Sequence, residues 1–495
     1  MFLLVILFLI SALGLYIWLF YENVKRYPKG PTPIPLFGNL LSVDFRRLHE
    51  NLSEYSKKYG NVYTIWLPLP YVVITDYDLI KEAFAKKGDD FSGRTNAFPD
   101  TLFQNVENGG VIFSQGDNWK EQRRTSIHIL RDFGMGKNLM EEQILLSAQE
   151  FLAHMESIKD KDAIDLRHPI QVFIANIINK TLFGFSYDYD NSDRLMGNAD
   201  QFNELFNAMR ESRLTMFAQM FPFLFHVPII GYLAKGRFER MMSGVLKSIK
   251  EDVERSLKNY NPDDEPECFV QAYYQKMQTN KSLDYENLLN VCMDFYLAGM
   301  ETTTTTLRWS TLFMATNQSI QDKIRKEIMS VLGPDRKPTS NYKSQMPYTM
   351  ATIHEIQRCA NIVSLNANHR TTKDTSIGSI PIPANTYVIG HIYHVMAHSP
   401  VFKDSMQFRP ERFLMDDGIT SNKDAVEQMC PFSIGKRQCA GEALAKAELF
   451  AGLVTMLQHY KIEPVEGKPV DMNPICAGVL LPKPQQLRVT PVATQ

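Results

Sequence analysis

The chain begins with twenty residues that carry no charged side chain, MFLLVILFLISALGLYIWLF. An α-helix rises about 1.5 Å per residue, so this segment can cross the hydrocarbon core of a bilayer, which is roughly 30 Å thick. A cleaved signal peptide is the alternative interpretation. It fits poorly, because the segment has no basic start, its apolar run is long, and no small-residue cleavage site follows. We therefore predict an uncleaved transmembrane anchor over residues 1–20.

Positive charges and prolines follow this apolar segment. Lys25, Arg26 and Lys29 lie just beyond it, and such residues stay on the cytosolic side of a membrane. Four prolines then occur within residues 28–35, which favours a stiff, extended backbone. We predict a basic, proline-rich hinge over residues 21–38, followed by one large cytosolic domain over residues 39–495.

The hydrophobic pattern of this domain is mostly helical. Two runs at 62–67 and 71–75 are rich in β-branched and aromatic residues and predict a β-hairpin. Beyond them, apolar residues recur at helical spacing. The predicted helices cover residues 78–87, 118–131, 139–157, 168–184, 197–211, 236–258, 284–316, 318–332 and 347–360, with strand-like segments near 370–390 and 475–490. With no repeat and no linker-like stretch, this pattern predicts a mainly α domain with small β-sheets.

A second apolar stretch lies at residues 214–230 and is interrupted by Pro222 and Pro228. It has two interpretations of equal weight. The stretch is either a segment of the hydrophobic core or a second patch that contacts the membrane. The second interpretation would suit a site that receives lipophilic molecules from the bilayer.

Composition sets the broad class of the protein. Hydrophobic residues make up 44% and charged residues 22% of the 495 positions, which is typical of a globular protein with a sizeable core. The net charge of -2 gives no electrostatic reason to expect nucleic-acid binding. The six cysteines are too few and too scattered for a disulfide framework, so a reducing compartment is expected.

One cysteine, Cys439, lies in the segment FSIGKRQCAG at residues 432–441. Gly435 allows a sharp backbone turn, and Gly441 lets the backbone lie close to a flat cofactor. Arg437 offers a guanidinium group to a carboxylate such as a haem propionate. Strong helix formers follow Cys439, and a helix N-terminus favours the thiolate form of a cysteine. The alternative is a buried structural cysteine, the usual role of a lone thiol.

This segment resembles the haem-binding signature of cytochrome P-450 enzymes, in which a cysteine thiolate binds the haem iron. The resemblance implies haem b as the cofactor and Cys439 as the axial iron ligand, with Phe432, Gly435 and Gly441 in the cofactor-binding loop. It extends over the whole chain and implies the cytochrome P-450 fold, a single large catalytic domain behind a transmembrane helix. The wording LRDFGMGK at residues 130–137 is close to the animal microsomal family-two group.

The segment Leu297 to Thr303 lies within a long apolar helix. Gly299 would cost about 1 kcal/mol against alanine there, so we interpret Ala298 and Gly299 as a place where something flat approaches the helix. The motif alone is weak, because threonines in helices usually bond their own backbone. By resemblance it is the oxygen-activating helix, with Thr302 and Glu301 as catalytic residues and Ala298 against the cofactor.

Two further motifs gain a role from the resemblance. Glu355 and Arg358 lie three apart on one helix face, and by default they would form a solvent-exposed ion pair. In the family this pair closes a buried triad with a later arginine. The resemblance implies Arg409, in the segment FRPERF at 408–413, as that third member, and gives all three a structural role near the cysteine loop.

Trp119 and Arg123 lie four apart on a predicted helix, and both side chains are hydrogen-bond donors only. They suit an anion, and the resemblance assigns them to the haem propionates together with His369 and Arg437. Relatives often have a proline where Asn366-Ala367-Asn368 precedes His369, so the shape of the substrate pocket stays open. Positions that line the distal pocket in the family are all apolar here: Ile112, Phe113, Leu297, Ala298, Val363, Ala367 and Val479.

The resemblance implies a monooxygenase that inserts one oxygen atom from O2 into a lipophilic substrate, either a fatty acid, a steroid-like molecule or a xenobiotic. The chain has no GxGxxG fingerprint after a strand, so electrons must come from a separate NADPH-dependent flavoprotein reductase, with cytochrome b5 as a further candidate partner. The expected location is the endoplasmic reticulum membrane. Six basic residues predict either a docking face for the reductase or ordinary solvated surface: Lys120, Arg124, Arg131, Lys137, Lys436 and Lys446.

Two alternative functions remain on the same fold. An isomerase or dehydratase would rearrange peroxides without a reductase, but the intact pair of Glu301 and Thr302 argues against it. A haem-binding sensor without turnover would be favoured if that pair or Arg437 were missing, and neither is missing.

Overall fold

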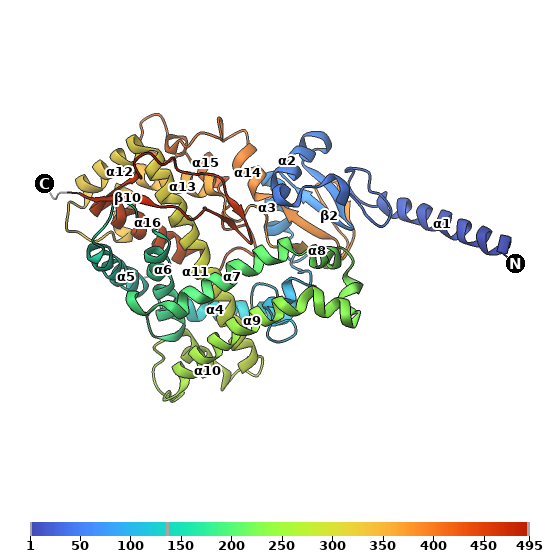
Figure 1. Ribbon diagram of the computed structural model, residues 1–495, viewed down its shortest axis with the longest axis horizontal. Helices are drawn as coiled ribbons and strands as arrows, with labels where there is room; N and C mark the ends of the chain where they lie inside the picture. The colour runs from blue at the N-terminus through green and yellow to red at the C-terminus, as the bar shows by residue number, and fades with distance from the viewer. Residues whose placement is uncertain (1, 135–137, 493–495) are drawn as a thin grey trace.

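The computed structural model describes residues 2–134 and 138–492, and most of them lie in helices (Figure 1). This mainly α architecture with small sheets confirms the predicted fold class. The longer helices are α1 (Phe2–Val24), α2 (Leu48–Tyr59), α4 (Gly116–Asp132), α5 (Asn138–Ser157), α6 (Arg167–Phe183), α7 (Asp193–Glu211), α8 (Arg213–Met220), α9 (Pro228–Leu257), α10 (Phe269–Met277), α11 (Tyr285–Thr316), α12 (Gln318–Val331), α13 (Pro347–Ala360) and α16 (Glu442–His459). Short helices are α3 (Tyr77–Lys81), α14 (Ile392–His398) and α15 (Lys423–Glu427).

The strands form one four-stranded sheet and three two-stranded sheets within the described residues. The predicted hairpin is present as β1 (Val62–Leu67) and β2 (Leu69–Ile74), paired antiparallel from Val62 opposite Ile74 to Leu67 opposite Leu69. The sheet continues through β6 (Tyr387–Gly390) to β3 (His369–Arg370). The pairs are β7 (Tyr460–Pro464) with β10 (Leu487–Pro491), β4 (Thr375–Ile377) with β5 (Ile380–Ile382), and β8 (Ile475–Cys476) with β9 (Leu480–Leu481).

Helix α1 projects from the body beside the β1–β2 hairpin (Figure 1). It has 23 residues, a mean hydropathy of 2.7 and no buried residue, so it is long and apolar enough to cross a membrane. It ends at Val24, beyond the predicted limit of residue 20. The proline-rich segment that follows packs on β1, where a Cβ at Gly30 would lie 1.8 Å from the Thr64 carbonyl oxygen.

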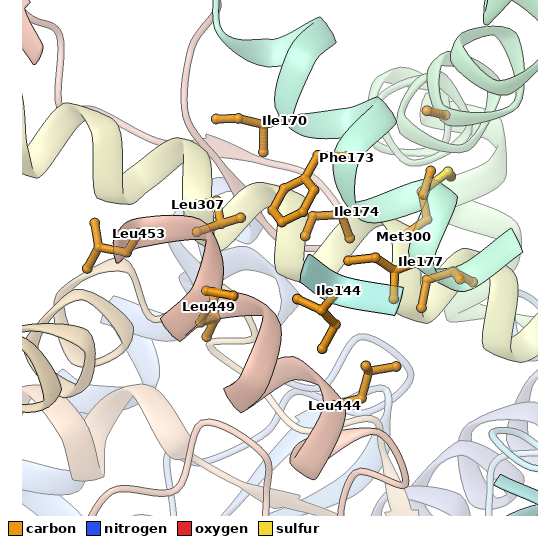
Figure 2. Packing of buried hydrophobic residues seen from close by; sticks show 14 of the residues in the cluster. Ile144, Ile170, Phe173, Ile174, Ile177, Met300, Leu307, Leu444, Leu449 and Leu453 are labelled. Carbon is orange, nitrogen blue, oxygen red and sulfur yellow. The ribbon is translucent and has the colours of Figure 1, made fainter. Parts of the chain in front are cut away.

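The main hydrophobic core lies where α5, α6, α11 and α16 meet (Figure 2). Helix α11 is buried along most of its length, and the Asp284 side chain caps its start by accepting a hydrogen bond from the Asn287 N–H. Helix α16 approaches α11 closely, because a Cβ at Gly452 would lie 2.9 Å from Leu307 and 3.1 Å from Phe173. This packing fixes α11 and the N-terminal end of α16 relative to each other.

The apolar stretch at 214–230 is largely exposed, which contradicts the interpretation of it as a core segment. Within it and the following turn of α9, the side chains of Leu214, Phe217, Phe223, Val227, Ile229, Tyr232 and Leu233 are exposed. We call these seven residues the apolar patch. It lies on the same side of the body as α1, and Phe221 contacts Phe37 of the proline-rich segment with ring centroids 6.3 Å apart (Figure 1).

Four histidines gather where α14 packs on α2. The His394 ring centroid lies 5.8 Å from that of His391 and 4.9 Å from that of His398, while His49 of α2 contacts Tyr393. Burial is the first cause that lowers the pKa of each of the four, and it lowers the pKa of His394 to about 4. All four imidazoles are therefore neutral near pH 7.

These histidines predict that the protein loses stability in mild acid. Below pH of about 6.5 the unfolded chain takes up protons that the folded cluster does not, so the free energy of unfolding falls from there down to about pH 4. We expect a lower Tm at pH 5 than at pH 7, and a smaller loss in His394→Gln. The exposed His128 of α4 offers a control, and a His128→Gln variant that flattened the pH dependence equally would contradict this assignment.

Candidate functional site

The loop before α16 closes on itself around Cys439. The Cys439 N–H donates to the Phe432 carbonyl at 2.9 Å, and the Gln438 N–H donates to the Gly435 carbonyl at 3.0 Å. Gly435 has φ of 84°, and a Cβ there would lie 1.8 Å from the Phe84 carbonyl oxygen. No other residue fits this position, so the glycine at 435 is required by the turn itself.

No contact within the described part of the protein requires a glycine at position 441. Its φ is −93°, which any residue can adopt, and a Cβ there would have no protein atom within 4 Å. The residue borders the same cavity as Cys439. A bare backbone at this place suits a group inside the cavity that lies close against the loop, as the flat face of a porphyrin would.

The cavity has a volume of about 310 Å³, within the range of about 300–1,000 Å³ that is usual for small-molecule sites. Segments far apart in the sequence form its wall, from α4, α6, α11, α13, β3 and α16. Ten of the predicted residues border it: Ile112, Arg123, Ala298, Thr302, Val363, Ala367, His369, Phe432, Arg437 and Gly441. Cys439 borders it as well.

Six predicted residues are not among those that line this cavity in the described part of the chain. Phe113 stacks on Phe103 with ring centroids 5.3 Å apart, and Leu297 is buried in the main core. Gly435 lies where the cysteine loop approaches the Phe84 carbonyl. Of the remaining three, Trp119 lies under the Arg437 guanidinium, Glu301 contacts Asn203 of α7, and Val479 lies in the turn between β8 and β9.

The Cys439 side chain is exposed to the cavity, although it lies deep within the molecule. Burial raises the pKa of its thiol, while the Gly441 N–H and the Arg123 guanidinium act in the opposite direction. The backbone N–H at the start of α16 thus favours the thiolate as expected, but burial outweighs this effect in the protein alone. A bound metal ion would deprotonate a coordinating thiol.

Three arginines converge beside the cysteine loop without an acidic partner at hydrogen-bond distance. Arg437 donates to the Ser92 carbonyl at 2.7 Å and to the Ser114 carbonyl at 2.7 Å, and its Nη1 atom has no partner. Burial, with Arg94 and Arg123 nearby, lowers the pKa of Arg437 to about 7. Arginine stays protonated in proteins, so the lowered pKa of Arg437 means that its buried positive charge lacks stabilisation. The site therefore needs an anion. Two haem propionates would supply it.

Trp119 and His369 are two uncharged residues close to these arginines. The Arg437 guanidinium lies over the Trp119 ring at 3.7 Å from its centroid, and the buried Trp119 Nε1 has no partner. His369 Nδ1 donates to the Phe91 carbonyl at 2.8 Å. Burial lowers the pKa of His369 well below its usual value, so the neutral ring has an acceptor at Nε2. The unpartnered Trp119 N–H fits an anionic group, and His369 would donate to that group only when Nε2 is protonated.

Arg94 is a site residue that the sequence analysis missed. Its Nε donates to the Ile112 carbonyl at 2.9 Å, and its Nη1 donates to the carbonyls of Ala367 and Asn368 at 3.0 Å. It thereby ties together two cavity-lining segments that lie far apart in the sequence. A lone arginine in the segment SGRT has no spacing partner, so no local signal could have identified it.

Asp294 of α11 was also missed. Its Oδ2 atom accepts hydrogen bonds from the N–H groups of Val111 at 2.7 Å and Ile112 at 3.0 Å. A Cβ at Gly110, whose φ is 81°, would lie 2.4 Å from the same oxygen. Asp294 therefore fixes the loop that presents Ile112 to the cavity. Burial raises the pKa of this carboxyl to about 7.

The Thr302 hydroxyl borders the cavity and donates to the Ala298 carbonyl at 2.7 Å. Gly299 borders it too, but a Cβ there would lie 2.7 Å from Ile178 of α6. The glycine is thus needed for helix packing, which corrects its interpretation as a contact for a flat group. Ala298 alone keeps that role.

Glu301 points toward α7 instead of into the cavity. Its Oε1 atom accepts from Asn203 at 3.1 Å and from Thr305 at 3.3 Å, and its Oε2 atom has no partner. Burial raises the pKa of this carboxyl. Glu301 and Thr302 therefore face different surroundings although they are adjacent in the sequence, because neighbours on a helix point about 100° apart.

The predicted triad has a different third member. Glu355 and Arg358 are paired in the core at 2.7 Å, as predicted. The arginine that joins them is Arg412, whose Nε donates to Glu355 Oε1 at 3.0 Å. Arg409 contributes only its backbone N–H to Glu355, and its side chain is 42% exposed. The assignment of Arg409 was wrong, because FRPERF holds two arginines and a short helix turns the second one inward.

Comparison with known proteins agrees with this geometry. The family model described as Cytochrome P450 matches residues 28–489. Cytochrome P450 2C14 of Oryctolagus cuniculus is 35% identical over 96% of each chain. Cytochrome P450 2C28 of Mesocricetus auratus is 34% identical over 96% of each chain, and cytochrome P450 2F2 of Mus musculus is 35% identical over 93% of each.

Proposed function

The chain belongs to the cytochrome P450 family and is a monooxygenase of that type, and from this premise we propose that it inserts one oxygen atom of O2 into a lipophilic substrate with electrons from a separate NADPH-dependent reductase. The observation that carries this proposal is the cavity that joins the Cys439 thiol, a wall of cations and the Thr302 hydroxyl. When bound, haem supplies the oxygen chemistry.

The residues around the cavity have distinct proposed roles in holding the cofactor. Cys439 would hold the iron, and Arg94, Arg123, Arg437 and Trp119 would hold the propionates in one orientation. His369 would join them with its Nε2 atom protonated. Gly441 leaves the face of the group free to lie on the loop. These contacts also explain why several buried donors lack partners in the protein alone.

The substrate class follows from the remaining wall. Ile112, Ala298, Val363 and Ala367 border the cavity, and all four are apolar. A lipophilic molecule such as a fatty acid, a steroid-like molecule or a xenobiotic is the class that fits these four positions.

Thr302 is the proposed catalytic hydroxyl, because it is next to Ala298 on the cavity wall. Its own proton is held by the Ala298 carbonyl, so its oxygen can accept a hydrogen bond from a group in the cavity. Glu301 stays a proposed catalytic acid, and its carboxyl lies beside Asn203 and Thr305, which are not among the described residues that line the cavity.

A reductase and cytochrome b5 are proposed partners, but the predicted basic docking face is a surface of mixed charge. Lys120, Arg124, Lys436 and Lys446 each pair with an acidic residue, respectively Asp117, Glu121, Asp89 and Glu442. Arg131 is exposed, and Lys137 lies outside the described residues. Docking by simple charge attraction would therefore be weak.

We propose the endoplasmic reticulum membrane as the location, with α1 as a single-pass anchor and the catalytic domain in the cytosol. Support comes from α1 and from the apolar patch, which lies on the side of the body from which α1 projects (Figure 1). Seven exposed apolar side chains close together are typical of a surface that contacts another molecule or a membrane.

A reconstitution experiment tests the proposed function. We expect the full-length protein in vesicles with NADPH and a reductase to form an oxygenated product from members of a panel of fatty acids, steroids and drug-like compounds. Omitting NADPH or the reductase should remove the product. Conversion of lipid peroxides without NADPH would favour the isomerase alternative, and haem spectral shifts without any product would favour the sensor.

A further inference from the structure

A second cavity lies between the loop at residues 96–105 and α9, and the proposed function makes no use of it. Its volume is about 490 Å³, which exceeds the 310 Å³ of the cavity at Cys439. The 3-10 helices Asp100–Phe103 and Pro222–His226, together with α9 and α11, form its wall. Within the described part of the chain, no residue lines both cavities. The second cavity is therefore a separate site.

Stacked aromatic rings join the two segments that line these cavities. The residues on either side of Phe103 line the second cavity, and the residue before Phe113 borders the cavity at Cys439. The buried Phe103 ring stacks on Phe113 with centroids 5.3 Å apart and on Phe206 of α7 with centroids 5.9 Å apart. A molecule in the second cavity would therefore be held apart from the cysteine by packed side chains.

The buried part of the lining of the second cavity is apolar. Met242 of α9 and Met293 of α11 are buried, and Phe98 packs on Phe225 with ring centroids 4.6 Å apart. The larger apolar side chains of the lining are Phe98, Leu102, Phe225, Met242, Leu246 and Met293. An alkyl chain against these side chains would be removed from water, which favours binding.

The more exposed part of the lining is polar, and we call it the mouth of the second cavity. Its amide and hydroxyl side chains are Asn96, Thr101, Gln104, Asn105 and Ser243. Asn96, Thr101 and Ser243 are exposed, whereas the Gln104 Nε2 atom is buried without a hydrogen-bond partner among the described residues. A buried donor without a partner is destabilising, so a ligand oxygen that accepted from Gln104 would stabilise this wall.

The mouth offers no uncompensated charge from its lysine and its acid. Lys235 and Glu239, one turn apart on α9, pair with each other at 2.9 Å. An anionic headgroup would have to compete with Glu239 for the lysine. A headgroup with hydroxyl groups and no charge needs no counter-charge and can bond the amides and hydroxyls of the mouth.

The apolar patch adjoins this cavity. Phe223 and Val227 of the patch flank Phe225 of the lining, and Tyr232 and Leu233 of the patch precede Lys235 on α9. If the patch lies in the bilayer, as the proposed location requires, lipids are the molecules that reach the cavity from this side. The volume is usual for small-molecule sites and suits one acyl chain better than two.

We infer that the second cavity binds one uncharged, single-chain lipid such as a monoacylglycerol. Its acyl chain lies on the apolar lining, and its hydroxyl groups bond the side chains of the mouth. The inference rests on the proposed membrane location for the supply of the lipid. It needs no haem chemistry, and no covalent bond changes.

Photocrosslinking tests whether the lipid occupies this cavity. The probe is monooleoylglycerol with a diazirine in its acyl chain, added to phosphatidylcholine vesicles that contain the full-length, haem-loaded protein. Illumination should label α9 near Met242 and α11 near Met293, as mapped by mass spectrometry of peptides. Clotrimazole, an azole that binds haem iron, should leave this label unchanged. Label that clotrimazole removes, or label confined to the apolar patch, would overturn the inference.

Two tryptophan substitutions on α9 form a matched pair for this experiment. Ser243 is exposed and lines the cavity, whereas Lys247, one turn further along, is exposed and is not among the described residues that line it. Ser243→Trp should fill the mouth and lower the label at Met242 and Met293 at least about fivefold, which equals about 1 kcal/mol. Lys247→Trp should keep the label. Equal labelling of the two variants would contradict the site.

Competition between headgroups tests the lipid class. Unlabelled monooleoylglycerol should displace the probe better than oleate, which has the same acyl chain and a carboxylate. Glu239→Gln releases Lys235, so oleate should then compete up to about fivefold better, the upper range for one exposed ion pair. Glu254→Gln releases Lys250 elsewhere on α9 and should change nothing. If oleate is the better competitor in the wild type, the site takes an anionic lipid and the inference is wrong.

The outcomes separate this inference from the proposed function. Crosslinking needs neither NADPH nor a reductase, so it reports on the cavity even if the protein oxygenates no substrate. A protein that forms oxygenated products but shows no label near Met242 and Met293 would keep the proposed function and lose this inference.

Discussion

Replacing Cys439 with alanine should abolish both the thiolate signature of the haem and the catalytic activity. The wild type, reduced and exposed to carbon monoxide, should have the red-shifted Soret band that thiolate ligation produces. Among the described residues, Cys439 is the only cysteine that lines the cavity, and Cys439→Ala removes its thiol. We therefore expect that the band disappears and that product formation falls to the level of a control without enzyme.

The other cysteines provide the comparison for this experiment. Cys476 on β8 is half-buried and is not among the residues that line the cavity, so Cys476→Ala should keep the band and the activity. Folding of both variants is followed by far-UV circular dichroism. A natively folded, haem-loaded Cys439→Ala protein that kept the red-shifted band would overturn the assignment of the iron ligand.

The second large effect concerns the triad that supports the cysteine loop. Arg412→Ala should lower the free energy of unfolding by about 3–5 kcal/mol, because it leaves the buried Glu355 carboxylate with Arg358 as its single positively charged partner. The side chains of Glu355, Arg358 and Arg412 are each no more than 2% exposed. Denaturant unfolding of the detergent-solubilised protein, followed by circular dichroism, measures this loss.

Arg409 offers a matched control in the same segment. Its side chain is 42% exposed, and its ion pair with Asp404 is 3.9 Å long. Arg409→Ala should therefore change the free energy of unfolding by about 1 kcal/mol or less. If Arg409→Ala destabilised the protein more than Arg412→Ala, the triad would be assigned to the wrong arginine in the structure.

Local sequence was sufficient where chemistry depends on neighbours in the chain. The turn at Gly435, the cysteine at 439 and the helix formers after Gly441 act within a few residues of one another, and the structure places them as the pattern indicates. The same holds for the hairpin at 62–74 and for the long apolar helix at 285–316. Strong periodic patterns of this kind leave little choice of secondary structure.

Local sequence did not identify the correct triad member where two arginines of one segment could both reach Glu355. Arg409 and Arg412 are three apart, and only the 3-10 turn at Pro410–Phe413 determines which one points toward Glu355. Arg94 gave no signal at all, because its partners Ile112 and Ala367 come from distant segments. Contacts between distant segments depend on how the helices pack, and a linear pattern does not contain that information.

The pocket walls illustrate the same limit. Apolar residues predicted for the pocket differ in their position. Ile112 and Val363 border the cavity, whereas the equally apolar Phe113, Leu297 and Val479 are not among the described residues that line it. Hydrophobicity identifies residues that avoid water. It does not tell whether a side chain meets other side chains, as Phe113 meets Phe103, or an open space.

The sequence by itself determined the family, the mainly α class, the apolar helix at the start of the chain and the position of the cysteine that we propose as the iron ligand, because each of these depends on residue type and local spacing. Only the tertiary structure decided which arginine joins the triad, that three guanidinium groups converge beside the cysteine loop, and which member of the Glu301–Thr302 pair borders the cavity. These features depend on the directions of side chains from α11, α13 and α16. Those directions are fixed by the packing of whole helices in a common core.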